Sequence, residues 1–224
     1  MASYKIVSRK ELLMESLQDF FNNPKNIISI IPIINNNREI SLRVIDWFVT
    51  NYSKKHNISY MINKKTNEIV SKKSEYDPAE CKEFVVYLNY KLQLKAYSKE
   101  QFDPFCRRSR IDFYYDKEKV SNYVSKYNID LKDSSNYLEN NTESYFTTTS
   151  GQLNFFRWII KNKIIEYIIE NIKEIEHDMN ICYKKHYNHS GKNEKKNRKK
   201  RHELSVSASK SLSKSNVKVV LTFN

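Results

Sequence analysis

Residues 151–182 carry the most regular pattern in the sequence, a series of apolar residues at steps of three or four positions. The series comprises Leu153, Phe156, Ile160, Ile164, Ile168, Ile172, Ile175, Met179 and Cys182. Because residues three or four positions apart lie on one face of an α-helix, this spacing predicts a long amphipathic helix, bent near Asn162 and Lys163. Charged residues throughout the segment exclude a membrane span, so we expect the helix to pack across a sheet.

Three shorter segments also predict helices. Residues 8–21 begin with Ser8, have Glu11 three positions later and continue with apolar residues at helical spacing, which is the pattern of a capping box. Residues 41–56 place their apolar side chains on one stripe and their charged side chains elsewhere, so we expect an amphipathic helix. Residues 117–127 predict a short helix.

Two segments in the first third of the chain predict β-structure. Residues 26–35 form an apolar, β-branched run with Pro32 inside it, for which we expect an edge strand or a buried irregular segment. Residues 59–70 predict two short strands around a turn at residues 63–67.

Two further strands are expected in the middle of the chain. Residues 86–96 alternate between apolar and more polar side chains, which predicts a strand over at least residues 84–90, although residues 91–101 fit a helix equally well. Residues 110–115 predict another strand, and the polar residues 130–150 predict a surface loop with one helical turn.

The character of the chain changes after the long helix. We expect residues 1–182 to form an α+β core domain, residues 183–202 a basic mobile loop, and residues 203–224 a β-hairpin that returns to the core sheet, since residues 217–223 are too apolar to remain in solvent. The predicted fold class is therefore α+β, with a small mixed or antiparallel sheet packed by the long helix.

The charge balance favours an acidic partner. The 224 residues include 39 Lys plus Arg against 26 Asp plus Glu, a net charge of +13. Nucleic acid is the first candidate and an anionic membrane surface the second. However, the frequent Asn, Ile and Lys have A/T-rich codons, so codon bias explains part of the lysine excess. The two glycines, Gly151 and Gly191, cannot form the glycine-rich phosphate-binding loops or the nucleophile elbow.

Cysteine usage and the N-terminus indicate an intracellular protein. Cys81, Cys106 and Cys182 are odd in number and widely spaced, which favours a reducing compartment. The first residues lack the apolar core of a signal peptide, and we expect no membrane partner.

Residues 102–115 form the first candidate binding surface, because three arginines lie there among aromatic residues. The candidates are Arg107, Arg108, Arg110, Tyr114 and Tyr115. A guanidinium group binds phosphate through two hydrogen bonds, and aromatic rings stack on exposed bases. The alternative is structural: the arginines pair with Asp103, Asp112 or Asp116, and the aromatic rings belong to the core.

The second candidate is the basic segment at residues 184–201. It contains Lys184, Lys185, Lys192, Lys195, Lys196, Arg198, Lys199, Lys200 and Arg201. Nine basic residues against Glu194 leave a net charge of +8, so the segment is suited to phosphate contacts that weaken steeply with salt. A merely solvated charge run and a nuclear-localisation signal are the alternatives.

Metal and catalytic sites are weakly indicated. Cys182, His186 and His189 have a C-x3-H-x2-H spacing, but the paired cysteines that usually open a zinc site are absent. Asp112 with Asp116, or Glu166 with Glu170, could hold Mg²⁺ as in two-metal nucleases, yet no known nuclease signature surrounds either pair. We therefore predict no metal, no cofactor and no catalytic residues.

Four stretches resemble a family of conserved uncharacterised proteins of nucleocytoplasmic large DNA viruses, the relatives of mimivirus and phycodnaviruses. They are SLRVIDWFVTNYSKKHN at 41–57, YLNYKLQLKAYSKEQFDPFCRR at 87–108, GQLNFFRW at 151–158 and HELSVSASKSLSKSNVKVVLTF at 202–223. The resemblance implies a virus that makes its own transcription, replication and packaging proteins, and it assigns no catalytic residue.

These observations predict a non-enzymatic viral protein that binds DNA or RNA and acts in viral transcription, replication or genome packaging. The expected location is the virus factory in the host cytoplasm or the virion, with the nucleus reachable through the basic segment. One alternative is a virion-structural or protein-interaction factor with other viral proteins as partners, and the other is a metal-dependent nuclease.

Overall fold

A computed structural model describes residues 8–34, 40–70, 77, 79–107, 109–129 and 144–190, the last six of these by their backbone alone. Its contacts divide the chain into two units, Met1–Cys182 and Tyr183–Asn224. The predicted hairpin and most of the predicted basic loop lie outside the described residues, and residues 183–190 continue the last helix.

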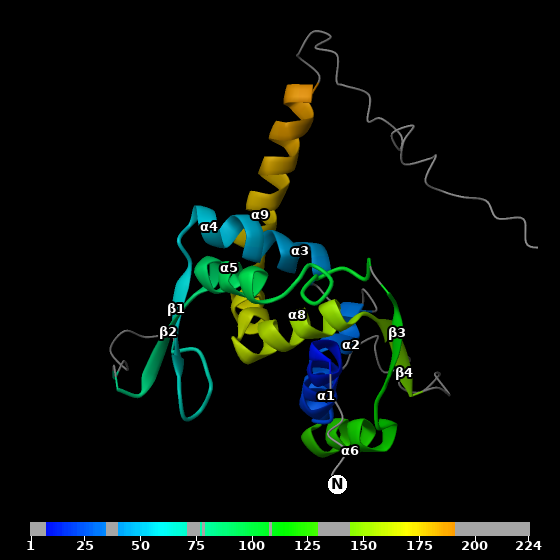
Figure 1. Ribbon diagram of the computed structural model, residues 1–224. Coiled ribbons are helices and arrows are strands. Elements are labelled where there is room, and N and C mark those ends of the chain that lie inside the picture. Colours follow the sequence, from blue (N-terminus) through cyan, green and yellow to red (C-terminus); the bar gives the residue numbers. More distant parts are fainter. Residues whose placement is uncertain are drawn as a thin grey trace, which may run out of the picture. The chain divides into compact units, whose positions relative to one another are not determined.

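The chain is α+β, as predicted, with two small antiparallel sheets in its described part (Figure 1). The elements are α1 (Arg9–Phe21), α2 (Pro24–Ile34), α3 (Leu42–Trp47), the π-helix η1 (Phe48–Tyr52), α4 (Ser53–Lys55), β1 (Ser59–Asn63), β2 (Cys81–Val85), α5 (Val86–Ala96), β3 (Ile111–Tyr114), α6 (Lys117–Tyr127), β4 (Tyr145–Thr148), α8 (Ser150–Lys161) and α9 (Ile164–Ser190). None of the described helices is long and apolar enough to cross a membrane.

The predicted long helix is present as two helices, and its bend is a complete break. Helix α8 ends at Lys161, and Lys163 adopts a left-handed conformation with φ of 59° before α9 begins at Ile164. Helix α8 packs against α1 and α2, and it also meets a sheet, as expected, because the Trp158 ring lies 6.3 Å from the Phe84 ring of β2. Helix α9 meets β1 of the same sheet through Tyr167, which stacks on Tyr60 at 5.0 Å between ring centroids.

The predicted capping box opens α1. The backbone N–H of Glu11 donates to Ser8 Oγ at 3.2 Å, and the backbone N–H of Ser8 donates to Glu11 Oε2 at 2.7 Å. These bonds satisfy backbone donors that the first turn of a helix leaves unpaired. The helix predicted at residues 41–56 is also confirmed as the continuous series α3, η1 and α4, and Ser41 caps its start through the Val44 N–H at 3.3 Å.

The prediction of an edge strand or irregular segment at residues 26–35 is wrong, because Pro24–Ile34 is helix α2. Pro24 stands at the first helical position, where no N–H is needed. Five isoleucines of α2 are buried: Ile27, Ile28, Ile30, Ile31 and Ile33. Burial of each contributes about 1.5–3 kcal/mol, which outweighs the few tenths that β-branching costs in a helix.

The strand predicted over residues 84–90 is wrong in most of its length, since β2 ends at Val85 and Val86–Ala96 is helix α5. The alternating leucines of this segment face solvent, with Leu88 and Leu92 61% and 58% exposed. Their spacing therefore does not report a buried face. The predicted pair at residues 59–70 is partly confirmed: β1 forms, but its sheet partner is β2, and the second segment makes a single bridge between Ile62 and Ile69.

The strand predicted at residues 110–115 and the helix predicted at 117–127 are confirmed as β3 and α6. The sequence interpretation missed β4, because it expected a loop over the whole polar stretch at residues 130–150. Residues 130–143 of this stretch lie outside the described residues. Phe113 pairs with Phe146 and Tyr114 with Tyr145 in the register of this sheet. The first pair is buried in the core, so the second lies on the opposite, outward face.

Candidate functional site

Arg107, the first residue of the predicted arginine and aromatic surface, has a structural partner. Its Nη2 lies 2.8 Å from Asp103 Oδ1 and its Nε 3.1 Å from Oδ2, and its guanidinium carbon lies 4.9 Å from the centre of the Phe105 ring. The hydrogen bonds to Asp103 raise the pKa of Arg107. For this arginine the structural alternative, pairing with Asp103, is the arrangement observed.

The remaining residues of that surface divide by exposure. Arg110 and Tyr114 are exposed, and the Tyr114 ring contacts Tyr145 with 5.2 Å between centroids. Tyr115 is buried, with its ring 6.0 Å from that of Phe146. Arg108 lies outside the described residues. Of the described candidates, Arg110 and Tyr114 are therefore the two that a ligand reaches freely.

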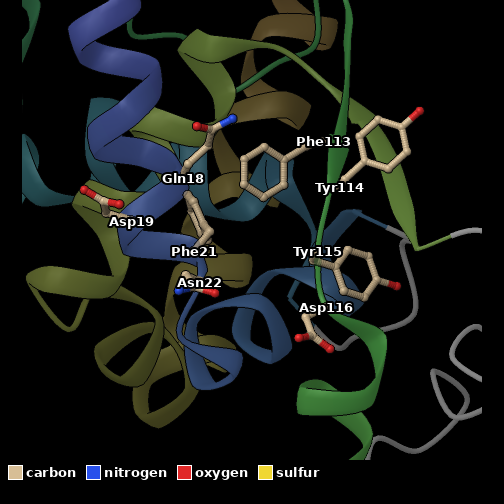
Figure 2. Close-up of a pocket in the computed structure, with 8 residues that line it drawn as sticks. All are labelled: Gln18, Asp19, Phe21, Asn22, Phe113, Tyr114, Tyr115 and Asp116. Atoms are coloured by element: carbon tan, nitrogen blue, oxygen red, sulfur yellow. The ribbon is translucent and has the colours of Figure 1, made fainter.

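A pocket beside this surface is acidic. It has a volume of about 360 Å³ and lies between the end of α1 and the β3–α6 connection (Figure 2). Its described lining residues include the carboxylates of Asp19 and Asp116 and no cationic side chain. Asp116 caps α6 by accepting the Lys119 N–H at 3.0 Å, and this bond lowers the pKa of Asp116. Such a pocket repels phosphate.

Two further carboxylates of the nuclease alternative make contacts within the protein. Asp112 accepts a hydrogen bond from Thr147 Oγ1 at 2.9 Å, and Glu166 pairs with Lys163 at 3.2 Å. No group of three or more His, Cys, Asp or Glu in the described part of the chain is arranged to hold a metal ion.

The basic segment is described only at its start. Lys184 is exposed on α9, while the side chain of Lys185 and all of residues 191–201 lie outside the described residues. The same holds for the side chains of His186 and His189. Phosphate binding by this segment stays a prediction.

A basic surface that the sequence interpretation missed runs along α8. It consists of two adjoining pockets of about 590 and 420 Å³ that share Tyr97 and Arg157. We call their union the α8 groove. Its lining residues are Asn67, Lys82, Asn89, Gln93, Asn154, Trp158, Lys161 and Asn162 in the larger pocket, Arg9, Leu12, Leu13, Ser16, Ala96 and Gln101 in the smaller, and the two shared residues.

The α8 groove is cationic throughout. Its charged lining residues are Arg9, Lys82, Arg157 and Lys161, and none of the described residues that line it carries a carboxylate. Arg157 donates from Nη1 to Ser16 Oγ at 2.8 Å and from Nη2 to Asn154 Oδ1 at 2.6 Å. Because both partners are neutral, they orient the guanidinium without cancelling its charge.

Neutral hydrogen-bonding groups and aromatic rings complete the groove. Trp158 donates from Nε1 to Asn89 Oδ1 at 3.2 Å, which orients the Asn89 amide. Tyr97 is half-buried, and its ring is nearly parallel to that of Phe102, at 6.3 Å and 18°. Asn154, Arg157, Trp158 and Lys161 recur at helical spacing on α8, and Asn89 and Gln93 do so on α5. These two polar stripes are the signal that the sequence offered for this site.

Comparison with known proteins identifies the family. The family model DUF7197, described as a family of unknown function, matches residues 4–223. The chain belongs to this family. A curated relative is the uncharacterized protein L507 of Acanthamoeba polyphaga mimivirus, which is 36% identical over 182 residues, or 81% of this chain. The predicted resemblance to giant-virus proteins is thereby confirmed.

The match covers 58% of the length of the mimivirus protein, so this DUF7197 chain corresponds to little more than half of that relative. No solved structure matches the chain.

Proposed function

We propose that this DUF7197 protein binds nucleic acid in the α8 groove and has a non-enzymatic role in viral transcription, replication or genome packaging. The observation that carries the proposal is the combination of four cationic side chains with a lining free of carboxylates among the described residues. Arg110 and the basic segment at residues 184–201 would add phosphate contacts outside the groove, and Tyr114, which lines the acidic pocket, would offer only a ring for base stacking. The virus factory in the host cytoplasm and the virion are the locations that suit this role.

Electrostatics supports a polyanionic ligand over a neutral one. In a chain with 26 acidic residues, a surface whose described lining has four cations and no acid concentrates positive potential in one concave strip. A phosphate backbone that enters it releases counterions for each phosphate neutralised. Arg157, held in place by Ser16 and Asn154, binds a phosphate with little loss of side-chain entropy.

The experiment is a binding titration of the full chain with labelled single- and double-stranded DNA and RNA at about 50 and 200 mM salt. The test variant is Lys82→Gln with Lys161→Gln, which removes two exposed charges from the groove. We expect weaker binding and a salt slope that is shallower by about 1.4, at roughly 0.7 per phosphate contact.

The matched control is Lys25→Gln with Lys173→Gln, which removes two exposed charges outside the groove. We expect this variant to bind nearly as tightly as the unmodified chain. No binding to any of the four nucleic acids at about 50 mM salt overturns the proposed function. Equal losses in the two variants overturn the placement in the groove.

A separate variant tests the basic segment. Replacing Lys195, Lys196, Arg198, Lys199, Lys200 and Arg201 by Gln removes six charges while leaving the groove intact. If both regions contact one strand, this variant combined with the groove variant loses more affinity than either alone.

A second candidate function, a protein-interaction role, is favoured by the outer face of α5. Leu88 and Leu92 are one helical turn apart and 61% and 58% exposed, and Leu94 is 41% exposed. Exposed leucines at this spacing are typical of a helix that packs against a partner. A viral protein that copurifies after nuclease treatment, and is lost in the variant Leu88→Gln with Leu92→Gln, would support this role.

A further inference from the structure

We infer that the α8 groove accepts an unpaired nucleotide, with its base against Tyr97 and its phosphate on Arg157, so that the ligand of this protein is single-stranded nucleic acid. This inference rests on the proposed function and specifies the form of nucleic acid that the groove takes. It follows from how aromatic, amide and cationic groups are combined at the point where the two pockets meet.

Tyr97 is placed as a stacking platform. It follows the last residue of α5 and lines both pockets, while Phe102 lies behind its ring at 6.3 Å with an interplanar angle of 18°. Phe102 is itself buried against Phe155 and Trp158. The tyrosine ring is therefore supported by the core on one side and lines the groove with the rest of its surface. A rigid ring of this kind stacks on any base whose flat face is free, and in a duplex those faces are covered by neighbouring base pairs.

Arg157 stands beside Tyr97 in both pockets, and its neutral partners leave it a full positive charge. The distance from a base to its own phosphate is short, so a ring and a guanidinium that line the same junction suit the two parts of one nucleotide. The other cations lie on either side of this junction: Arg9 lines the smaller pocket, and Lys82 and Lys161 line the larger one. They suit the phosphates that precede and follow the stacked nucleotide.

The larger pocket also offers hydrogen bonds of the kind that an unpaired base needs. Gln93 is half-buried in the lining, and its amide makes no hydrogen bond within the described part of the chain. Asn89 accepts from Trp158 with its oxygen, which leaves its amino group facing other partners. An amide group presents both a donor and an acceptor, which match the Watson–Crick edge of a base. That edge is available in a single strand and occupied in a duplex.

The described lining residues carry no carboxylate, which decides against cationic ligands. A peptide or polyamine with positive charge finds no partner among the described lining residues, and four cations repel it. A purely apolar ligand would leave the half-buried amide of Gln93, which has no hydrogen-bond partner within the described residues, without water. An anionic ligand with a flat polar ring satisfies the cationic, amide and aromatic groups of the groove at once.

The test compares a labelled 20-nucleotide single strand with the blunt duplex of the same sequence, using the full chain at about 100 mM salt. We expect the single strand to bind at least tenfold more tightly. Tyr97→Leu should weaken single-strand binding about 5- to 150-fold, which corresponds to the loss of one base–aromatic stack, and change duplex binding less than twofold. Gln93→Leu should also weaken single-strand binding selectively.

Tyr97→Phe keeps the ring and removes the hydroxyl, so it serves as the matched control and should bind the single strand within twofold of the unmodified chain. Retained binding in this variant shows that the leucine effect comes from the lost ring, and Gln93→Leu gives an independent reading if Tyr97→Leu fails to fold. Equal affinity for the single strand and the duplex, or equal losses for both in Tyr97→Leu, overturns the inference while leaving the proposed function standing. No binding to the single strand or the duplex, in both DNA and RNA form and at about 50 mM salt, overturns the proposed function itself.

Discussion

Trp47 and Asp178 are joined by a hydrogen bond across 131 positions of sequence, with the indole Nε1 at 3.2 Å from the carboxylate Oδ2. The other oxygen of Asp178 pairs with Lys55, and His56 Nε2 lies 3.9 Å from it. Burial acts to raise the pKa of Asp178, but the hydrogen bonds from Lys55 and Trp47 outweigh it, so this pKa is lowered. A single carboxylate thus joins α9 to α3 and α4.

We predict that Asp178→Asn lowers the free energy of unfolding at neutral pH by about 1–3 kcal/mol, because the lysine and indole donors lose a charged acceptor. Since the folded-state pKa lies below the unfolded value of about 3.9, this stabilisation is present above that value and is lost as pH falls through the folded-state pKa. Urea unfolding at a series of pH values measures it. The acid-dependent loss should be smaller in the variant, and a pH profile identical to that of the unmodified chain would contradict the prediction.

The sequence predicted helices well where a polar cap precedes a stripe that the fold then buries. Ser8 with Glu11, and Ser41, are caps of this kind, and α1 and α3 begin where expected. Hydrophobic periodicity did not indicate helices α2 and α5, for opposite physical reasons. Helix α2 is buried on most sides and so has no polar stripe, whereas α5 exposes its leucines and has almost no buried stripe. Periodicity requires one buried and one solvated face, and neither helix has both.

The sequence indicated the α8 groove only as separate polar stripes on α5 and α8, because the groove is assembled by tertiary packing. Its cationic residues come from three elements: Arg9 from α1, Lys82 from β2, and Arg157 and Lys161 from α8; Tyr97 lies just after α5. Local patterns place each residue on a helix or strand, but the packing of α8 on α1 brings Arg157 to Ser16, 141 positions away. By contrast, Arg107 finds its partner only four residues back, a spacing the sequence does show.

We predict that Gly151→Ala destabilises the protein. A Cβ at Gly151 would lie 2.6 Å from the carbonyl oxygen of Glu100 and 3.3 Å from the backbone nitrogen of Asp103. Because both atoms belong to backbone, the start of α8 must shift, and overpacking of this kind costs about 1–3 kcal/mol. Chemical denaturation measures the loss. Glu170→Ala, at an exposed position of α9, is the control and should change stability little; an unaltered unfolding midpoint for Gly151→Ala would refute the predicted clash.

We predict that Tyr60→Phe costs about 1 kcal/mol, since the Tyr60 hydroxyl donates to the Asn162 carbonyl at 2.6 Å and fixes β1 to the break between α8 and α9. Tyr167→Phe is a matched control, because its ring stacks on Tyr60 while its hydroxyl makes no hydrogen bond within the described chain. Thermal unfolding of both variants distinguishes the lost hydrogen bond from a general effect of removing a hydroxyl. Equal shifts in melting temperature would argue against the Asn162 contact.

The final prediction separates the two arginines that the sequence grouped together. Arg107→Gln should reduce stability by about 1–2 kcal/mol, since the buried carboxylate of Asp103 loses both guanidinium bonds, and leave nucleic-acid affinity nearly unchanged.

Arg107 also opposes the rise that burial causes in the pKa of Asp46, so in the variant this pKa should move higher, which NMR titration of the carboxyl group detects. Arg110→Gln should have the opposite effects on stability and affinity. Because Arg110 is exposed and makes no ion pair with any described residue, stability should stay constant, while nucleic-acid affinity and its salt dependence should fall. If Arg107→Gln weakens binding and Arg110→Gln does not, the pairing with Asp103 is broken when the ligand binds, and the surface at residues 102–115 acts through Arg107 instead.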